Sequence, residues 1–578
     1  MTLSIVQRSP DLSNTSFPKG IPPLLQRVYA ARGVLSDQDL VRTLAGLYRY
    51  EDLKGIHTAA VILADAVINR RRVLIVGDFD CDGATSSALA VRVLRAMGVA
   101  WVNYLVPNRF EYGYGLTPEI VAVARMERPD VLVTVDNGIA SVAGVEAARA
   151  LGMQVIVTDH HLAGKELPAA DAIVNPNQPG CPFPGKNTAG VGIIFYLLCA
   201  LRTTLEQRDW FAQRGIAKPN MADFLDLVAL GTVADVVGLD TNNRILVHQG
   251  LVRIRAGRTC AGILALVEVA RRRRNTLSAA DLGFALGPRL NAAGRLDDMS
   301  LGIELLLTDD ILQARQIAAE LDRLNEERKS IESGMHDDAL RILARLELDE
   351  DQSLPWGVCL FQEDWHQGVI GILASRVKEK LHRPVIVFAA SQDGEIKGSA
   401  RSIPGFHIRD TLDAIASRNP GLLLKFGGHA AAAGLSIRQQ DYGRFAAAFD
   451  EETRCTIAEE QLRAFVLTDG ELAINDFSMT TAELLREAGP WGQGFPEPVF
   501  DGCFELVEQR LVGEKHLKMV LVCPGGDQWV DGIAFNIDTD TWPNLSVRKV
   551  LAVYKLDINE FRGNRTLQLL VDHLEPVG

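Results

Sequence analysis

The sequence predicts an α/β protein with a doubly wound parallel-sheet domain, a long connecting helix, a second α/β domain and a C-terminal β-barrel. Between residues 56 and 175, short apolar runs rich in β-branched residues alternate with segments of helical spacing, the pattern of a parallel sheet covered on both faces. Residues 311–346 contain no proline and one glycine, Gly334, which favours a single long helix. From about residue 465, short strand-like runs separated by Gly, Pro and Asn are typical of a small barrel or sandwich.

The chain of 578 residues is too long for one hydrophobic core, and its length suggests roughly three to five domains. We expect an N-terminal extension at 1–55, a first α/β domain at 56–310, the connecting helix at 311–347, a second α/β domain at 355–458 and the barrel at 465–578.

The first α/β domain carries most of the regular pattern. Its expected strands are Arg72–Gly77, Trp101–Val106, Val131–Val135 and Gln154–Thr158, with helices at Thr85–Met97, Thr117–Arg125 and Ser141–Leu151. Helical spacing dominates from about residue 190 to 310. The longest apolar stretch, Val191–Leu201, is too short to span a bilayer, so we expect a buried helix and no membrane partner.

The connecting helix has apolar residues at a 4-3-7-4 spacing, namely Ile317, Leu321, Leu324, Ile331 and Met335. This stripe suits an amphipathic helix. A dimeric coiled coil would use the same stripe, but the heptads are few, so we favour a connector within one chain and expect a monomer.

The second α/β domain should contain strands at Val358–Phe361 and Pro384–Ala389 and a helix at Gly368–Leu381. The barrel strands are expected at Leu517–Val522, Trp529–Phe535, Lys549–Lys555 and Thr566–Val571.

Charge and cysteine content limit the possible functions. A net charge of −13 would repel phosphate if it were spread evenly, but a long chain can combine a local basic groove with an acidic exterior, and cations offset acidic residues in a metal site. Eight cysteines occur without a Cys-x-x-Cys pair, which argues against a zinc ribbon or a disulfide scaffold. With no apolar run in residues 1–20, no signal peptide is expected, and we expect a cytoplasmic protein.

Carboxylates and histidines follow the predicted strands of the first domain, where the active crevice of an open α/β sheet lies. In chain order these candidates are Asp78, Asp80, Asp82, Asp136, Asp159, His160, His161 and Asp235. If residues 78–82 are extended, alternate carboxylates share one face. Such close like charges repel one another unless a cation neutralises them.

Each candidate alone has a simpler interpretation. An Asp after a strand is often only a helix N-cap, the His pair could be structural, and the run Asp78–Gly83 hints at a calcium loop. The later Glu and flanking helices of an EF-hand are missing. The coincidence of all candidates in one domain favours a metal site, and carboxylate plus imidazole ligands suit Mn²⁺ or Mg²⁺. Asp136 could bridge two ions about 3.5–4 Å apart.

These residues resemble the DHH phosphoesterase superfamily and, within it, the RecJ branch of single-stranded-DNA exonucleases. The resemblance spans roughly residues 50 to 575. It is carried by Asp78–Gly83 with Thr85, Val135–Gly138 and Thr158–His161, and supported by Asn108–Gly115, Gly287–Arg295, Trp365–Arg376, Gly398–Ser402 and Gly427–His429.

The resemblance implies a DHH domain, a DHHA1 domain and an OB-like barrel, with two Mn²⁺ or Mg²⁺ ions. One ion would be held by Asp82, Asp136, His160 and Asp235, and the other by Asp80 and Asp136 with Asp78 nearby. His161 would lie near the scissile phosphate or its leaving oxygen, and Asp159 would orient a histidine.

The resemblance also implies an activity: 5′ to 3′ degradation of single-stranded DNA to mononucleotides, in DNA recombination and repair. A single-strand-binding protein and a RecQ-type helicase are the implied protein partners.

Arginines and small polar residues supply the expected grip on substrate, because guanidinium groups bind phosphates bidentately and Gly-rich helix starts bind anions. The candidates are Arg109, Tyr114, Arg289, Asn291, Arg295, Ser375, Arg376, Arg401, Gly428 and His429. Tyr114 could stack on a base or belong to the core. The charge run Arg271–Arg274 has no glycine context, and surface salt bridges are the expectation there.

Two rival functions remain. A small-substrate relative, such as an oligoribonuclease or a nucleotide or pyrophosphate phosphatase, would need only two domains, so the long connector and third domain argue against it. A non-catalytic DNA-binding scaffold is disfavoured because every expected carboxylate and histidine is present.

Overall fold

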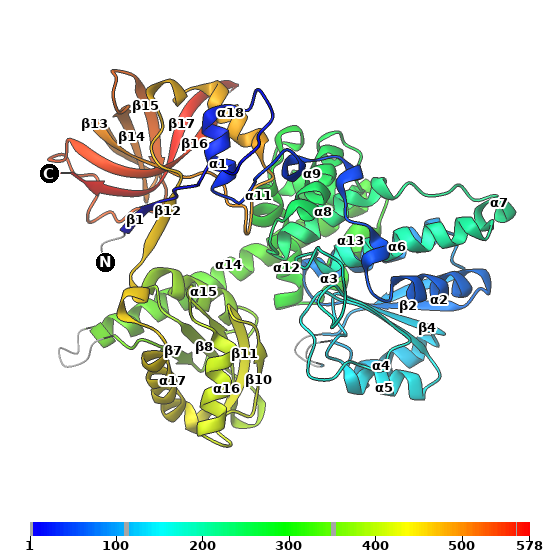
Figure 1. Ribbon diagram of the computed structural model, residues 1–578. Coiled ribbons are helices and arrows are strands. Elements are labelled where there is room, and N and C mark those ends of the chain that lie inside the picture. The colour runs from blue at the N-terminus through cyan, green and yellow to red at the C-terminus, as the bar shows by residue number, and fades with distance from the viewer. Residues whose placement is uncertain (1–3, 109–111, 113–114, 348–353, 562, 578) are drawn as a thin grey trace. The chain divides into compact units, whose positions relative to one another are not determined.

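The computed structural model describes residues 4–108, 112, 115–347, 354–561 and 563–577. The chain forms two compact units (Figure 1). The first comprises residues 6–294, 298–321 and 467–578, and the second comprises residues 1–5, 295–297 and 322–466.

A parallel five-stranded sheet organises the first unit, in the order β3-β2-β4-β5-β6. Its strands are β2 (Arg72–Val76), β3 (Trp101–Leu105), β4 (Val131–Val135), β5 (Gln154–Thr158) and β6 (Ala172–Val174). All five residues of β4 are buried, as expected for a central strand covered on both faces. The predicted doubly wound sheet is therefore confirmed, and β6 is a strand that the sequence did not reveal.

Helices cover both faces of this sheet (Figure 1). Helices α4 (Pro118–Ala124) and α5 (Val142–Ala150) pack against one face through Ile120 and Val145. Helices α2 (Ile56–Ile68), α3 (Cys81–Ala96) and α6 (Gly190–Gln207) pack together beside the same strands. Helix α6 is buried along most of its length, which confirms the buried helix expected at 191–201.

The other helices in this part of the chain follow the sheet or precede it. They are α1 (Pro23–Ala30), α7 (Trp210–Arg214), α8 (Leu225–Ala234), α9 (Thr241–Arg255), α10 (Ala261–Val269), α11 (Ala279–Asp281), the π-helical turn η7 (Leu282–Leu286), α12 (Gly287–Leu296), α13 (Ser300–Leu307) and α18 (Met479–Ala488).

A closed five-stranded barrel completes the first unit, in the order β13-β14-β15-β17-β16. The strands are β13 (Phe500–Val512), β14 (His516–Val522), β15 (Trp529–Ala534), β16 (Lys549–Phe561) and β17 (Asn564–Pro576). Closure pairs β13 with β16, so the sheet has no free edge. This confirms the predicted C-terminal barrel, and β13 is the strand that had not been anticipated.

The second unit contains a mixed sheet in the order β10-β11-β9-β8-β7. Its elements are β7 (Val358–Gln362), α15 (Ile370–Leu381), β8 (Val385–Ala390), β9 (Glu395–Arg401), α16 (Ile408–Arg418), β10 (Lys425–Gly428), β11 (Ala432–Arg438) and α17 (Tyr442–Thr456). One core lies between the sheet and α16 and α17, and another lies on the side of α15. Short strands β1 (Ser4–Gln7) and β12 (Phe465–Thr468) pair with each other.

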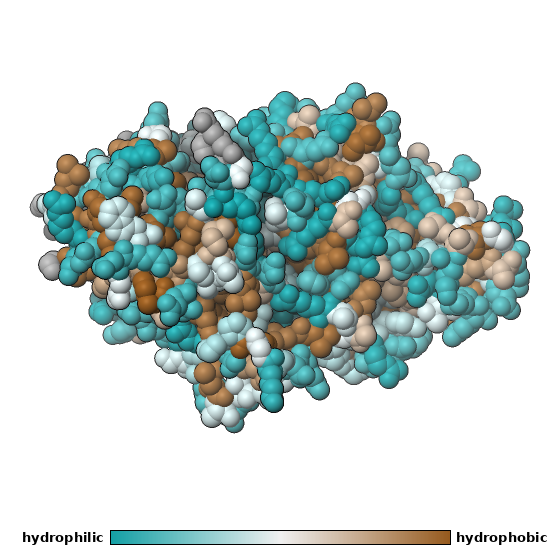
Figure 2. Space-filling model, turned by 90° about the horizontal axis from the view of Figure 1, so that it is seen from above, coloured by the Kyte–Doolittle hydropathy of each residue, from teal (hydrophilic) through white to brown (hydrophobic). Residues whose placement is uncertain are grey.

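The predicted long helix is confirmed as α14 (Ile311–Glu347). Its residues Leu321, Leu324 and Met335 are buried within the single chain, which favours the connector interpretation over a dimeric coiled coil. Among the residues that the structure describes, no helix is long and apolar enough to cross a membrane. On the face shown in Figure 2, hydrophilic residues cover most of the surface and hydrophobic residues form scattered patches.

Candidate metal centre

The first three carboxylates lie where β2 turns into α3. Asp80 is the N-cap of α3, and its Oδ1 accepts a hydrogen bond from the backbone N–H of Gly83 at 2.9 Å. Asp82 therefore sits in the first helical turn and is fully buried. The expected extended segment and the helix start at Thr85 are wrong, because the Asp80 cap starts the helix at Cys81. The carboxylates converge through a strand–turn–helix bend instead of a shared strand face.

Asp136 follows β4 in a left-handed backbone conformation with φ of 62°. Aspartate tolerates this region better than most residues, and the turn carries the carboxylate over the end of the sheet. Gly190 lies directly against it, since a Cβ there would come within 2.6 Å of Asp136. The buried Asn137 amide donates to the carbonyls of Val76 and Val135, which ties the ends of β2 and β4 together.

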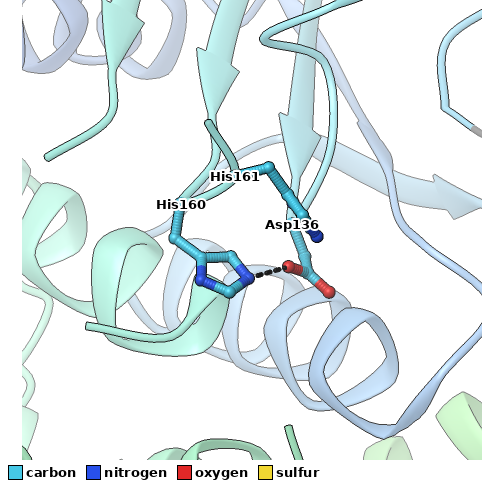
Figure 3. Close-up of side chains that lie close together, drawn as sticks. All are labelled: Asp136, His160 and His161. Carbon is cyan, nitrogen blue, oxygen red and sulfur yellow. Dashed lines mark ion pairs between the residues drawn. The ribbon is translucent and has the colours of Figure 1, made fainter. Parts of the chain in front are cut away.

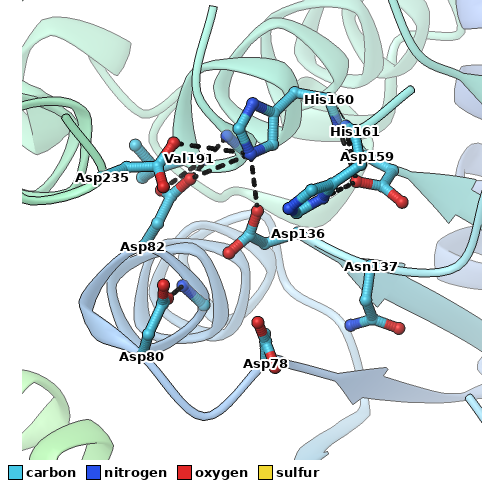
Figure 4. Close-up of polar contacts among 12 residues, drawn as sticks. Asp78, Asp80, Asp82, Asp136, Asn137, Asp159, His160, His161, Val191 and Asp235 are labelled. Atoms are coloured by element: carbon cyan, nitrogen blue, oxygen red, sulfur yellow. Dashed lines mark hydrogen bonds and ion pairs between the residues drawn. The ribbon is translucent and has the colours of Figure 1, made fainter. Parts of the chain in front are cut away.

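The third strand end supplies Asp159, His160 and His161 after β5. Asp159 is buried, and its Oδ1 accepts from the backbone N–H groups of both histidines and lies 2.7 Å from His161 Nδ1. Its other oxygen accepts from the backbone N–H of Ile139. Asp159 is thus saturated by this loop and orients His161, while the His160 ring points to the neighbouring carboxylates (Figure 4).

Asp235 caps the C-terminal end of α8 and contributes from the helical layer. Helix α8 approaches α3 closely because Gly231 has no side chain. A Cβ at Gly231 would lie 2.2 Å from Thr85 Oγ1 and 2.9 Å from Asp82 Oδ1.

The four segments meet around His160 (Figure 3). His160 Nε2 lies 3.1 Å from Asp136 Oδ1, 3.5 Å from Asp235 Oδ2 and 4.0 Å from Asp82 Oδ2. Three groups of donor atoms lie within 4.8 Å of one another: Asp82 with His160 and Asp235, Asp78 with Asp80 and Asp136, and Asp136 with His160 and His161. Asp136 belongs to two of these groups, so it lies where a ligand shared by two ions is needed.

The electrostatics of the cluster favour a bound cation. Burial, together with the charge of Asp80, raises the pKa of Asp82 to about 7, although the N–H groups of Val191 and Gly190 counteract part of that rise. Burial and the surrounding carboxylates raise the pKa values of Asp136 and Asp235 well above the usual range. Their carboxylate forms thus lack compensating positive charge, which a divalent cation would supply.

The histidine loop behaves differently. Burial lowers the pKa of His161, but the Asp159 hydrogen bond and the charges of Asp159, Asp78 and Asp80 outweigh it and raise that pKa to about 9. Burial raises the pKa of Asp159, yet the hydrogen bond and charge of His161 outweigh burial, so the net shift is downward. This pair is an imidazolium–carboxylate pair at neutral pH.

Two supporting contacts around the centre were not evident in the sequence. The first two N–H groups of α6, from Gly190 and Val191, donate to the two oxygens of Asp82 at 2.7 and 2.9 Å. The only signal was the glycine at the start of an apolar helical run. Asn291, expected to contact substrate, accepts a hydrogen bond from the backbone N–H of Cys81 at 2.8 Å, so its carbonyl holds the Asp80–Asp82 loop.

The other expected substrate residues are spread over both units. Arg289 Nη1 donates to Ala285 O, and Arg295 Nη1 donates to Gly368 O. Arg109 and Tyr114 lie outside the described residues.

The second unit holds the remaining expected substrate residues. Arg401 donates to Ser399 Oγ and Ala400 O, and burial lowers its pKa. Ser375 Oγ donates to Gly371 O, and Arg376 pairs with Glu332 at 3.2 Å. His429 follows Gly428, whose φ is 147°.

Comparisons with known proteins agree with this architecture. The model of the DHH family N-terminal domain matches residues 72–232, that of the DHHA1 domain matches 354–454 and that of the RecJ OB domain matches 468–573. The single-stranded-DNA-specific exonuclease RecJ of Dickeya dadantii is 57% identical over 565 residues, covering 98% of each chain. The Escherichia coli exonuclease of the same name is 56% identical and covers 97% of each chain.

Solved structures show the same fold. The crystal structure of RecJ in complex with Mn²⁺ from Thermus thermophilus superposes with a TM-score of 0.77 at 29% identity, covering 96% of this chain and 76% of that one. The Mg²⁺ complex from the same organism gives a TM-score of 0.72 at 28% identity, with coverage of 96% and 75%.

Proposed function

The chain belongs to the RecJ family of single-stranded-DNA-specific exonucleases, and we propose that it removes mononucleotides from the 5′ end of single-stranded DNA. It is a metal-dependent phosphodiesterase of the DHH type. The observation that carries the proposal is the convergence of buried carboxylates and His160 at the ends of three parallel strands and α8.

The donor groups fit two divalent cations, Mn²⁺ or Mg²⁺. Asp82, Asp136, His160 and Asp235 would hold one ion, and Asp78, Asp80 and Asp136 would hold the other. Hard carboxylate oxygens with one imidazole suit these metals. When bound, the cations activate water for attack and offset charge on the phosphoryl oxygens.

The chain's own residues supply orientation and a proton. Asp159 fixes the His161 ring through its Nδ1, so Nε2 is the ring atom left to face substrate. Because its pKa is about 9, His161 carries a proton at neutral pH and can donate it to the departing 3′ oxygen. Asn137 and Asn291 keep the strand ends and the Asp80–Asp82 loop in place.

Arginines that can bind phosphate supply the proposed grip on substrate. Their support is chemical: a guanidinium binds phosphate oxygens bidentately, and Arg401 is held by Ser399 and Ala400 without an acidic partner among the described residues. Together with Arg401, the proposed set contains Arg109, Tyr114, Arg289, Arg295, Ser375, Arg376, Gly428 and His429.

An end-labelling assay tests the activity and its polarity. Single strands labelled at the 5′ or the 3′ end are incubated with Mn²⁺, with duplex DNA and short RNA as controls. We expect immediate release of labelled mononucleotide from the 5′-labelled strand only, and no release by the Asp136→Ala protein. Activity confined to very short RNAs, or full activity of Asp136→Ala, would contradict the proposal.

We also propose that the protein acts as a cytoplasmic monomer. All eight cysteines lie in the described residues and none forms a disulfide, as in a reducing compartment; light scattering in solution checks the oligomeric state. The family resemblance supports a single-strand-binding protein and a RecQ-type helicase as partners, and co-purification from cells tests both.

A further inference from the structure

A groove of about 1020 Å³ opens beside the metal centre, entirely within the first unit. One wall is the end of α8 with the following residues, including Val233 and Val236, which flank Asp235. The π-helical turn η7 and residues 271–273 continue this wall, and strands β16 and β17 of the barrel form the opposite one. The volume exceeds the roughly 300–1,000 Å³ of common small-molecule sites, so an extended occupant fits better.

An exposed phenylalanine projects from η7 at this groove. Phe284 has 86% of its surface exposed, an unfavourable state for a large apolar side chain. Its turn packs tightly on the last turn of α8, since a Cβ at Gly283 would meet Val233 at 3.2 Å and one at Gly287 would meet Ala234 at 3.0 Å. Phe284 is therefore held next to the helix end that carries Asp235, and π-helical turns are frequent at functional sites.

The groove is basic although the whole chain is acidic. Seven Arg and Lys and five Asp and Glu line it, in a chain of net charge −13. Four of the acids are already paired: Asp281 with Arg272, Glu560 with Arg273, Asp557 with Arg486 and Glu497 with Lys555.

The remaining basic residues are Arg42, Arg255 and Arg271. Arg42 donates to the carbonyls of Glu487 and Ala488, and Arg255 donates to that of Leu277. Arg271 is exposed and makes no ion pair with any residue that the structure describes. Burial lowers the pKa of His248 to about 4, and the charges of Arg42 and Arg255 add to that shift, as expected where positive charge is uncompensated.

We propose that this groove binds the single strand beyond the metal centre, with a base stacked on Phe284 and phosphates held by Arg271 and its basic neighbours. An aromatic platform beside a basic track is how proteins grip single strands without reading sequence. Continuity with Asp235 favours the enzyme's own substrate over other anionic occupants. The inference rests on the proposed exonuclease function and assigns a subsite for nucleotides that are not being cleaved.

Paired substrates test the subsite. A 5′-phosphorylated dinucleotide occupies only the metal centre, whereas a strand of about 30 nucleotides spans more than one binding track. Phe284→Ala and Arg271→Asn should weaken binding of the long strand about 5- to 100-fold and leave dinucleotide hydrolysis within about twofold of the parent protein. Phe284→Trp should restore binding, and Phe284→Leu should not, because only the former keeps a stacking face.

Arg128→Asn is the matched control for Arg271→Asn. Both arginines are exposed and have left-handed backbones, with φ of 48° and 53°, and asparagine tolerates that region. Met126→Ala, at a residue that is 82% exposed and distant from the groove lining, is the control for Phe284→Ala. Neither control should change long-strand binding.

Binding is measured by fluorescence anisotropy of the labelled strand in EDTA, so it does not depend on catalysis. If the parent protein binds the strand but cuts nothing, the proposed function fails while the groove remains testable. Unchanged long-strand binding in Phe284→Ala and Arg271→Asn would overturn the subsite and leave the groove to an acidic peptide. An equal loss on dinucleotide and long strand would also overturn it, because Phe284 would then serve the reacting nucleotide.

Discussion

Replacing Asp82 by asparagine should stabilise the metal-free protein while it removes metal binding. The folded pKa of Asp82 is about 7 against 3.8 for the ordinary carboxyl group, a rise of about 3 units that corresponds to about 4 kcal/mol. Because this carboxyl has a higher pKa when folded than when unfolded, its charge increasingly destabilises the folded protein as the pH rises from about 4 to about 7. Above that range the whole penalty is present.

Asparagine removes the charge but keeps only one carbonyl acceptor. The two oxygens of Asp82 accept N–H groups from Gly190 and Val191, so one of these hydrogen bonds is lost at a cost of about 1–3 kcal/mol. The net gain at about pH 8 is then about 1–3 kcal/mol, or roughly 2–12 °C for a domain of this size. At about pH 5 only about 2 kcal/mol of the charge penalty remains, and the lost hydrogen bond cancels it.

Thermal unfolding in EDTA and in Mn²⁺, each at about pH 8 and about pH 5, measures these effects. Asp226→Asn is the matched control, since Asp226 is also buried in α8 but its carboxylate is occupied by Thr259 and Cys260. The control should keep its Mn²⁺-induced rise in melting temperature, and Asp82→Asn should lose it. A metal-free Asp82→Asn protein that melts well below the parent at about pH 8, or equally at both pH values, would refute the electrostatic reasoning.

Three other changes have defined outcomes. Gly190→Ala places a methyl group within 2.6 Å of Asp136 and should lower the rate about 100-fold through displacement of that ligand by about 1 Å, measured with Mn²⁺ at saturating strand, whereas Gly152→Ala, with open space at its Cβ but φ of 82°, should affect stability alone. His161→Gln should lose the decline in kcat/KM that the parent shows as the pH rises through about 9, because only the protonated imidazole donates; an unchanged pH profile would exclude His161 as the proton donor. Arg32→Ala should destabilise the first unit by about 3–5 kcal/mol, because it leaves Asp469 charged in a site where both side chains are at most 1% exposed, while the exposed pair of Arg49 and Glu51 should contribute less than about 1 kcal/mol in calorimetry.

The sequence was most informative where local pattern and topology coincide. Parallel strands end at one edge of a sheet, so apolar runs followed by Asp136 or by Asp159–His161 locate the centre before any coordinates are known. The start of α3 was misplaced because Asp80 caps the helix through a side-chain acceptor, which hydrophobic spacing does not register. The N–H donors from α6 to Asp82 were also missed, since backbone groups leave no trace in residue identity.

Residues outside the strand ends were harder to assign from sequence. Asn291 looked like a substrate contact but accepts from Cys81, because a helix 210 residues later happens to pack on the aspartate loop. The expected salt bridges in the run 271–274 are confirmed for Arg272 and Arg273, whereas Arg271 has a different environment. Neighbours in sequence thus differ in role according to which element passes beside each one.

Net charge is a poor guide to function in this protein because its acidic and basic groups are segregated. Burial concentrates carboxylates at the metal centre, where their raised pKa values show that the fold tolerates them only at an energetic cost without cations. The glycines at 190 and 231 let helices approach within van der Waals distance of those carboxylates, so the fold prevents them from relaxing outward. A few paired acids and additional arginines a short distance away are then sufficient to make a basic groove. A chain of net charge −13 can therefore offer a polyanion both a cation-filled centre and a positive track, and neither is visible in the total.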